Sequence, residues 1–229
     1  MANSINTNVG AQVALQNLNQ TSRELAVTQN RVNTGQKVSS AKDNGAIWAT
    51  AQNQKANMQV LNTTRNTLQR TQSVNDVGLA AGDTIMDALR QMKELAAGPA
   101  STARDADLAA LRTEVVAAQA AAVFDGTAAL SGLTLTIAAA PTAGQIDADI
   151  ASAISALQTL GTSSKSTERS LAFNDKLQDA LEAGIGNLVD ADLAKESARL
   201  TALQTKQQLG VQALSIANQS SSILLGLFR

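Results

Sequence analysis

Proline is almost absent from this 229-residue chain. Residues 1–97 contain none, and the whole sequence has two. Because proline interrupts helices, long proline-free stretches can form helices of many turns. The abundance of alanine favours the same structure, and only 2% of the residues are aromatic. The sequence therefore predicts a mainly α fold of long, closely packed helices.

The chain contains no His, Cys or Tyr, which removes most enzyme chemistry. Imidazole bases, thiolate nucleophiles, zinc or haem ligation and disulfides are all excluded. The stretch from Ser39 to Lys42 matches a Ser-x-x-Lys acyl-transfer pattern, but neither a Ser-Asp-Asn nor a Lys-Thr-Gly motif accompanies it. No nucleotide-binding glycine motif occurs. We therefore predict no catalytic, cofactor-binding or metal-binding residue, and not an enzyme.

Three pairs of carboxylates lie at predicted helix starts. They lack the further oxygen ligands that calcium needs, so helix capping is the favoured interpretation. The pairs are Asp105 with Asp107, Asp147 with Asp149, and Asp190 with Asp192.

Charge divides the chain into basic ends and an acidic middle. Residues 1–75 hold 7 basic and 2 acidic side chains, residues 76–196 hold 8 and 17, and residues 197–229 hold 3 and none. The basic residues are dispersed, with no aromatic platform beside them, so we predict no nucleic-acid binding. The polar start and short apolar stretches likewise predict neither a secretory signal nor a membrane anchor.

Both ends carry apolar residues at helical spacing. The first stripe is narrow and stops near residue 32, whereas the last helix, from about residue 193, is apolar around most of its circumference. Each stripe is too exposed for a monomer, so both helices are expected to be loosely ordered alone and to fold on association with other subunits. The predicted polymerisation residues are Leu15, Leu18, Leu25, Val32, Leu200, Leu203, Leu214, Ile216, Ile223, Leu224 and Leu227.

Two joints are predicted to separate these terminal helices from the middle of the chain. One spans residues 33–45, because Asn33-Thr34-Gly35 and Asp43-Asn44-Gly45 both favour positive φ or a helix cap. The other spans residues 187–194, where Asp190 and Asp192 suit the start of a new helix. The predicted organisation is a terminal-helix domain, residues 1–32 with 195–229, and a helical bundle, residues 46–186.

Within the bundle, apolar residues keep one helical phase from Ile146 to Leu188, through the loop-like sequence Gly161-Thr162-Ser163-Ser164. A loop would have no reason to preserve phase, so we predict a single helix in which this tract is a weak, solvent-facing stretch. Two further helices are predicted, over residues 46–97 and from about residue 102 to 122. The alternation of Leu133, Leu135 and Ile137 predicts a small β-hairpin at about 127–144.

If the terminal helices of one copy dock on other copies through non-identical surfaces, an open helical filament follows. The sequence resembles bacterial flagellin over roughly residues 3–130 and 146–229. Short matching stretches carry the resemblance, in this order: Ser4-Ile5-Asn6-Thr7-Asn8, Arg31-Val32-Asn33-Thr34-Gly35, Ser40-Ala41-Lys42-Asp43-Asn44-Gly45, Lys93-Glu94-Leu95, Phe124-Asp125-Gly126, Asp190-Ala191-Asp192 and the tail from Ala217-Asn218-Gln219 to Leu224-Leu225.

The resemblance implies a subunit that polymerises into the flagellar filament, with its terminal helices as the inner tube and its bundle outside. It also implies the chain itself as partner, possibly with other flagellins, an export chaperone and the type III export apparatus, hook-associated proteins and a filament cap, and an extracellular location. The large outer domains of long flagellins look absent, as in the short flagellins of stalked alphaproteobacteria. Gln91 replaces the arginine of receptor-activating flagellins, so activation of the vertebrate innate receptor is not expected.

Two other functions remain compatible with the same helices. A hook-filament junction adaptor shares the terminal segments but is needed in few copies. A signalling coiled coil of the chemoreceptor type also uses Ala- and Gln-rich helical hairpins, but its ends would be well ordered without assembly.

Overall fold

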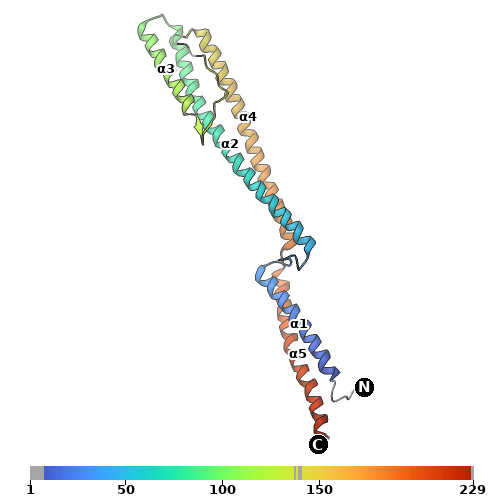
Figure 1. Cartoon of the computed structure of the whole chain (residues 1–229). Coiled ribbons are helices and arrows are strands. Elements are labelled where there is room, and N and C mark those ends of the chain that lie inside the picture. The colour runs from blue at the N-terminus through green and yellow to red at the C-terminus, as the bar shows by residue number, and fades with distance from the viewer. Residues whose placement is uncertain (1–7, 137, 139–140, 228–229) are drawn as a thin grey trace. The chain divides into compact units, whose positions relative to one another are not determined.

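The computed structural model describes residues 8–136, 138 and 141–227, with side chains described up to residue 219. These residues are almost entirely helical, and they include one small antiparallel sheet (Figure 1). The predicted mainly α fold is confirmed. The chain divides into two compact units. We call residues 1–57 with 181–229 the terminal unit, and residues 58–180 the bundle unit.

The terminal unit contains α1 (Val9–Thr34) and α5 (Leu193–Leu227), which lie side by side (Figure 1). The Asn8 side chain accepts a hydrogen bond from the Ala11 amide and so caps the start of α1. Gly35 ends the helix in the left-handed conformation, with φ of 70°, as the Asn-Thr-Gly sequence predicts. Residues 35–44 then form an irregular segment before the next helix.

The bundle unit is built from parts of two long helices and everything between them. These helices are α2 (Gly45–Ala97) and α4 (Ala143–Val189), and α3 (Thr102–Ala121) packs against them (Figure 1). Ser101 caps α3, because its side chain accepts from the Arg104 amide. The core lies at the three-helix end, where these fully buried side chains meet: Ile85, Leu89, Met92, Leu108, Val115 and Ile146.

α4 continues without a break through Gly161-Thr162-Ser163-Ser164, as the hydrophobic phase predicts. The expectation that this tract faces solvent is wrong for its two serines. Ser164 is buried and accepts a hydrogen bond from Gln72 at 2.7 Å, while the partly buried Ser163 accepts from Asn75 at 3.2 Å. The short hydroxyl side chains therefore line the contact between α4 and α2, which explains residues that are otherwise poor helix formers.

The β-hairpin lies earlier in the chain than predicted. β1 (Val123–Phe124) pairs with β2 (Thr127–Ala128) around Asp125 and Gly126, which both have positive φ. Residues 133–136 form no strand, and Ile137 lies outside the described residues. The alternation of Leu133 and Leu135 instead reflects side chains that pack on the core from an irregular segment.

Two glycines in α2 allow close packing against α4. A Cβ atom at Gly82 would overlap Leu157 Cδ2, and one at Gly78 would lie 2.9 Å from Leu160 Cδ1. The two leucines therefore pack directly on the α2 backbone. Among the described residues, no helix is both long enough and apolar enough to cross a membrane.

Candidate functional site

α1 and α5 run antiparallel, and polar contacts between described residues join them along their length. Asn8 Nδ2 donates to the Ala217 carbonyl at 2.8 Å, Gln207 Nε2 donates to Ser22 Oγ at 3.4 Å, and Arg31 pairs with Glu196 at 3.2 Å. These contacts join residues from opposite ends of the chain. The terminal helices thus contact each other within one molecule.

The seam between α1 and α5 holds only part of the predicted apolar set. Leu203 is 6% exposed, and Leu18 lies so close to Gly210 that a Cβ there would be 3.3 Å from Leu18 Cδ1. The remaining seam positions are half-buried, at Leu25, Val32, Leu200 and Leu214. These residues are brought together by the fold of a single chain.

Sequence reasoning missed two buried threonines in this seam. Thr21 and Thr28 are 2% and 1% exposed, and Thr21 Oγ1 donates to the Asn17 carbonyl on its own helix. Because that bond satisfies the hydroxyl, the methyl group of Thr21 can pack like that of a small apolar residue. Ala14, Thr21 and Thr28 are spaced by heptads and so lie on one side of α1, and this spacing is the sequence pattern that could have indicated their burial.

Other predicted interface residues point away from the seam. Leu15 is 48% exposed and Ile216 is 68% exposed, even though α1 and α5 are already paired. The side chains of Ile223, Leu224 and Leu227 lie outside the described residues. Further exposed apolar residues lie on the same two helices, at Val9, Val13, Val27, Leu193, Leu209 and Val211.

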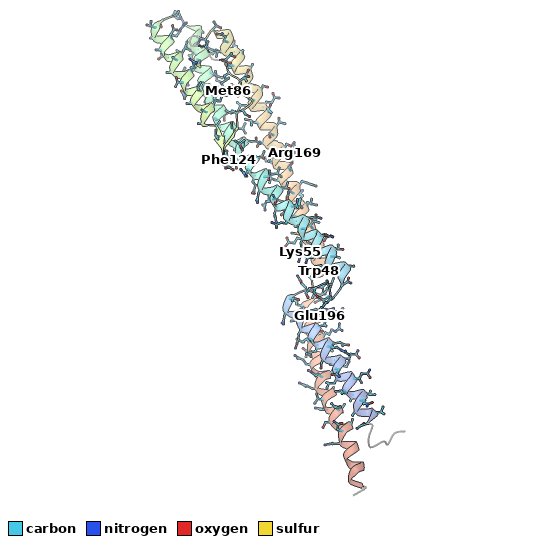
Figure 2. All side chains as sticks on the ribbon, viewed as in Figure 1. Trp48, Lys55, Met86, Phe124, Arg169 and Glu196 are labelled. Atoms are coloured by element: carbon cyan, nitrogen blue, oxygen red, sulfur yellow. The ribbon has the colours of Figure 1, made fainter. Side chains whose placement is uncertain are left out.

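Glu196 has a role that its position in the first turn of α5 did not reveal. Glu196 Oε1 accepts a hydrogen bond from Arg31 Nη1 at 3.2 Å across the helix pair. Figure 2 shows Glu196 at the end of α5 nearest the irregular segment of residues 35–44. The residue is 9% exposed, and Oε2 has no hydrogen-bond partner among the described residues. No local pattern reveals this partner, because Arg31 lies 165 residues away from Glu196 in the sequence.

The two predicted joints are hydrogen bonded to each other. The Lys37 amide donates to the Val189 carbonyl at 2.7 Å, and the Ala191 amide donates to Gly35 at 2.8 Å. Gln36 and Asp190 form an isolated antiparallel bridge between these bonds. Residues 35–38 therefore form a short paired ribbon with residues 189–191 at the end of α4, so the joints are not free linkers. The second joint begins after Val189 rather than at residue 187, because α4 extends to Val189.

Side-chain caps define the ends of this ribbon. Asp43 Oδ2 accepts from the amides and hydroxyls of Ser39 and Ser40, at 3.0–3.2 Å. Hydrogen bonds from the Ser40 and Ser39 amides hold the pKa of Asp43 below its ordinary value. Asn44 Oδ1 accepts from the Ile47 amide and caps α2, which begins at Gly45.

The remaining predicted joint residues lie at helix ends. Thr34 Oγ1 donates back to the Asn30 carbonyl in the last turn of α1, and Asn33 is exposed beside it. Asp192 Oδ1 accepts from the Ala194 and Lys195 amides, so its predicted capping role is confirmed.

Capping is the wrong interpretation for Asp149. This residue is 1% exposed, and its Oδ1 accepts from the Thr136 amide at 2.7 Å. It therefore holds the irregular segment after the hairpin, not the start of α4. Asp147 instead forms an ion pair with Lys93 at 2.6 Å, and Asp105 pairs with Arg104.

The described residues show no arrangement suited to a metal. No group of three or more acidic side chains is close enough to hold an ion in the described part of the chain. The Ser39 hydroxyl donates to Asp43, which makes this serine part of the ribbon's cap.

Comparisons with known proteins agree with this architecture. Residues 5–134 match the bacterial flagellin N-terminal helical region, and residues 143–228 match the bacterial flagellin C-terminal helical region. Flagellins FljK and FljM of Caulobacter vibrioides are each 50% identical over 99% of this chain and 99% of their own length. A flagellin of Brucella melitensis is 32% identical with the same coverage. This chain belongs to the bacterial flagellin family.

Proposed function

We propose that the exposed apolar faces of the α1–α5 pair are the surfaces through which this flagellin polymerises. A flagellin is a structural subunit of the flagellar filament, so the chain's function is assembly. The flagellin family is a family of structural proteins rather than enzymes.

The proposal is supported by apolar side chains of α1 and α5 that stay exposed when the two helices are paired. On α5, Leu209 is 59% exposed and Ile216 is 68% exposed; they are seven residues apart and share one face. Val13 and Val27 are 51% and 46% exposed on α1. Burying one such side chain fully contributes about 1.5–3 kcal/mol, so contact with further copies is strongly favoured.

The geometry favours a polymer over a closed dimer. The exposed apolar residues lie on two different helices, which offer non-identical surfaces to a neighbouring copy. A contact between non-identical surfaces need not close on itself and can propagate as an open helix. In such an array, the paired helices α1 and α5 would bury their exposed apolar faces against neighbouring copies and form the inner tube of the filament.

The other parts of the proposal follow the family. The predicted joints, residues 33–45 and 187–194, which the ribbon holds together, would serve as the link between an inner terminal-helix domain and an outer bundle domain. Flagellins form the extracellular filament, and we propose that this chain reaches it through the type III export apparatus with an export chaperone. Hook-associated proteins and a filament cap would be its partners at the two filament ends.

Seeded assembly tests the proposed surface. Leu209→Asp places a charge on the exposed apolar face of α5, whereas Gln208→Asp places the same charge on the adjacent exposed polar residue. We expect Leu209→Asp to abolish elongation of wild-type seeds and Gln208→Asp to elongate them normally. Both monomers should keep wild-type helicity by circular dichroism. Normal elongation by Leu209→Asp would overturn the assignment.

The same assay separates the adaptor from the filament subunit. Wild-type monomer should lengthen seeds indefinitely, as judged by electron microscopy. A fixed, short addition of protein would instead favour the hook-filament junction adaptor.

A further inference from the structure

The start of α2 contains the one Asn-Gly dipeptide of the sequence, Asn44-Gly45. This pair is chemically labile, because the backbone nitrogen of the second residue can attack the side-chain amide of the first. Glycine places no side chain in the way of the attack and leaves the backbone free to rotate. Both residues are exposed, so water and hydroxide from the solvent reach them.

The reaction open to such a pair is deamidation. Hydroxide removes the amide proton of Gly45, and the nitrogen attacks Cγ of Asn44. The bond from the Gly45 nitrogen to Cγ forms, the bond from Cγ to Nδ2 breaks, and Nδ2 takes a proton from water and leaves as ammonia. Water then opens the five-membered imide. Cleavage at Cγ gives aspartate, and cleavage at the backbone carbonyl of residue 44 gives isoaspartate.

The attacking nitrogen is unobstructed in this structure. Gly45 is the first residue of α2, so its amide has no hydrogen-bond partner within that helix. A Cβ built at Gly45 would meet nothing within 4 Å, so the space beside its Cα is open. The reactivity of the pair therefore depends on the conformation of Asn44.

The fold holds Asn44 in a conformation that does not allow ring closure. Its Oδ1 accepts from the Ile47 amide at 3.1 Å, and its backbone carbonyl accepts from the Trp48 amide at 2.9 Å. A capping residue has an extended backbone, which turns Cβ out of the plane of the following peptide unit. The imide ring needs Cβ, Cα and C of Asn44 nearly coplanar with the Gly45 nitrogen. Asn44 must therefore leave the cap before it can react.

The loop before Asn44 restrains this movement further. Asp43 Oδ2 accepts hydrogen bonds from the amides and hydroxyls of Ser39 and Ser40, at 3.0–3.2 Å. The Asp43 amide also donates to the Ser40 carbonyl at 3.1 Å. Asn44 lies between this closed loop and the first turn of α2, so its backbone can rotate only when the segment opens locally.

We propose that Asn44 is a deamidation site, which the folded segment 39–48 protects and its local opening exposes. The rate in the native chain is then the rate of the open segment multiplied by the fraction of time that the segment is open. The inference goes beyond the proposed function, because it concerns the covalent chemistry of a single molecule and requires no filament. The hydrogen bonds of Asp43 thus slow an irreversible change at the start of α2.

The two products change the start of α2 to different degrees. Aspartate keeps a capping oxygen and places a negative charge at the positive end of the helix dipole, so α2 still begins at residue 45. Isoaspartate adds one carbon to the backbone path between residues 44 and 45. The former backbone carbonyl of residue 44 then lies off the main chain, which removes the acceptor of the Trp48 amide from its place in the helix.

Mass spectrometry of the full-length monomer tests the proposal. Wild-type protein would be incubated in mildly alkaline buffer, with and without urea, and digested in acid so that the reaction stops. The peptide that contains residue 44 reports the mass gain of deamidation, and an isoaspartyl methyltransferase reports isoaspartate. We expect the rate at Asn44 in native buffer to be about tenfold or more below the rate in urea. Equal rates in the two buffers would overturn the proposal.

Gly45→Ala tests the identity of the reactive pair. The φ of Gly45 lies outside the left-handed region and the space beside its Cα is open, so alanine fits without strain. The added Cβ hinders the attack and restricts the backbone, so deamidation at Asn44 in urea should slow by about tenfold or more. A wild-type rate in this variant would show that the Asn-Gly pair is not the reactive site.

Asp43→Ala tests the protection by the loop. Removing its hydrogen bonds to Ser39 and Ser40 should raise the native rate at Asn44, divided by the rate of the same variant in urea, by about fivefold or more. Asp107→Ala is the matched control, because Asp107 is an exposed carboxylate of α3 in the bundle unit. The control should leave the ratio within about twofold of wild type. An unchanged ratio in Asp43→Ala, or an equal rise in both variants, would overturn the assignment of the protection to this segment.

Discussion

Arg31 of α1 and Glu196 of α5 form a partly buried ion pair at 3.2 Å, joining two helices from opposite ends of the chain. The Arg31 side chain is 30% exposed, whereas that of Glu196 is 11% exposed. The carboxylate therefore depends on the guanidinium more than the guanidinium depends on it. For this reason, we expect removal of the arginine and removal of the glutamate to change the stability of the helix pair by different amounts.

Arg31→Met should destabilise the terminal helix pair more than Glu196→Gln. The first variant leaves a buried carboxylate without its cation, a loss of roughly 1–3 kcal/mol. The second leaves an uncharged amide that still accepts a hydrogen bond from Arg31. Amide hydrogen exchange of α1 measures the difference. Equal protection in the two variants would contradict the dependence of Glu196 on Arg31.

The ribbon near Asp43 should loosen in acid. Because hydrogen bonds from Ser40 and Ser39 hold the pKa of Asp43 below its ordinary value of 3.8, its contribution to stability is fully present above that pH. The contribution is lost as the pH falls through the lower, folded-state pKa. Exchange of the Ser39 and Ser40 amides should therefore accelerate, relative to their intrinsic rates, below about pH 3.8.

Asp43→Asn provides the control for this effect. The variant keeps an oxygen that accepts hydrogen bonds but does not titrate in acid. Its Ser39 and Ser40 amides should show the same relative protection on both sides of that pH. If wild type and Asp43→Asn respond identically to acid, another group controls the ribbon.

Gly82→Ala should destabilise the bundle unit, whereas Gly184→Ala should not. A Cβ at position 82 would overlap Leu157 Cδ2, and such overpacking costs about 1–3 kcal/mol. A Cβ at position 184 meets nothing within 4 Å, so the better helix propensity of alanine stabilises α4 by up to about 1 kcal/mol. Thermal unfolding of the two variants should shift in opposite directions. A shift of the same sign in both would contradict the close packing of α2 on Leu157.

Hydrophobic phase and glycine position predicted the helices well. The phase from Ile146 to Leu188 identified α4 through a sequence that propensity alone would break. Gly35 and Gly45 located the end of α1 and the start of α2. These features act over a few turns of one helix, so a single sequence reveals them.

Contacts between distant segments were not predictable in the same way. Leu133 alternates with polar residues as in a strand, but the segment's backbone bonds instead to the side chains of Gln119 and Asp149. Thr28 is buried in the α1–α5 seam although its hydroxyl marks it as polar in any pattern. Such positions depend on which partner the fold supplies: the heptad spacing places Thr28 on one side of α1 but does not identify α5 as the helix that buries it.

Leu18→Asp should block filament assembly by separating α1 from α5. Leu18 packs near Gly210 in the seam, so a charge there is desolvated beside an apolar helix face. Leu214→Asp, a half-buried seam position on the partner helix, should act in the same way. In both variants the bundle unit has its own core of Ile85, Leu89 and Met92 and should remain folded. Exchange should therefore be fast in residues 9–34 and 193–219 and unchanged in residues 81–96. Filaments of normal length from either variant would show that assembly does not require the α1–α5 seam.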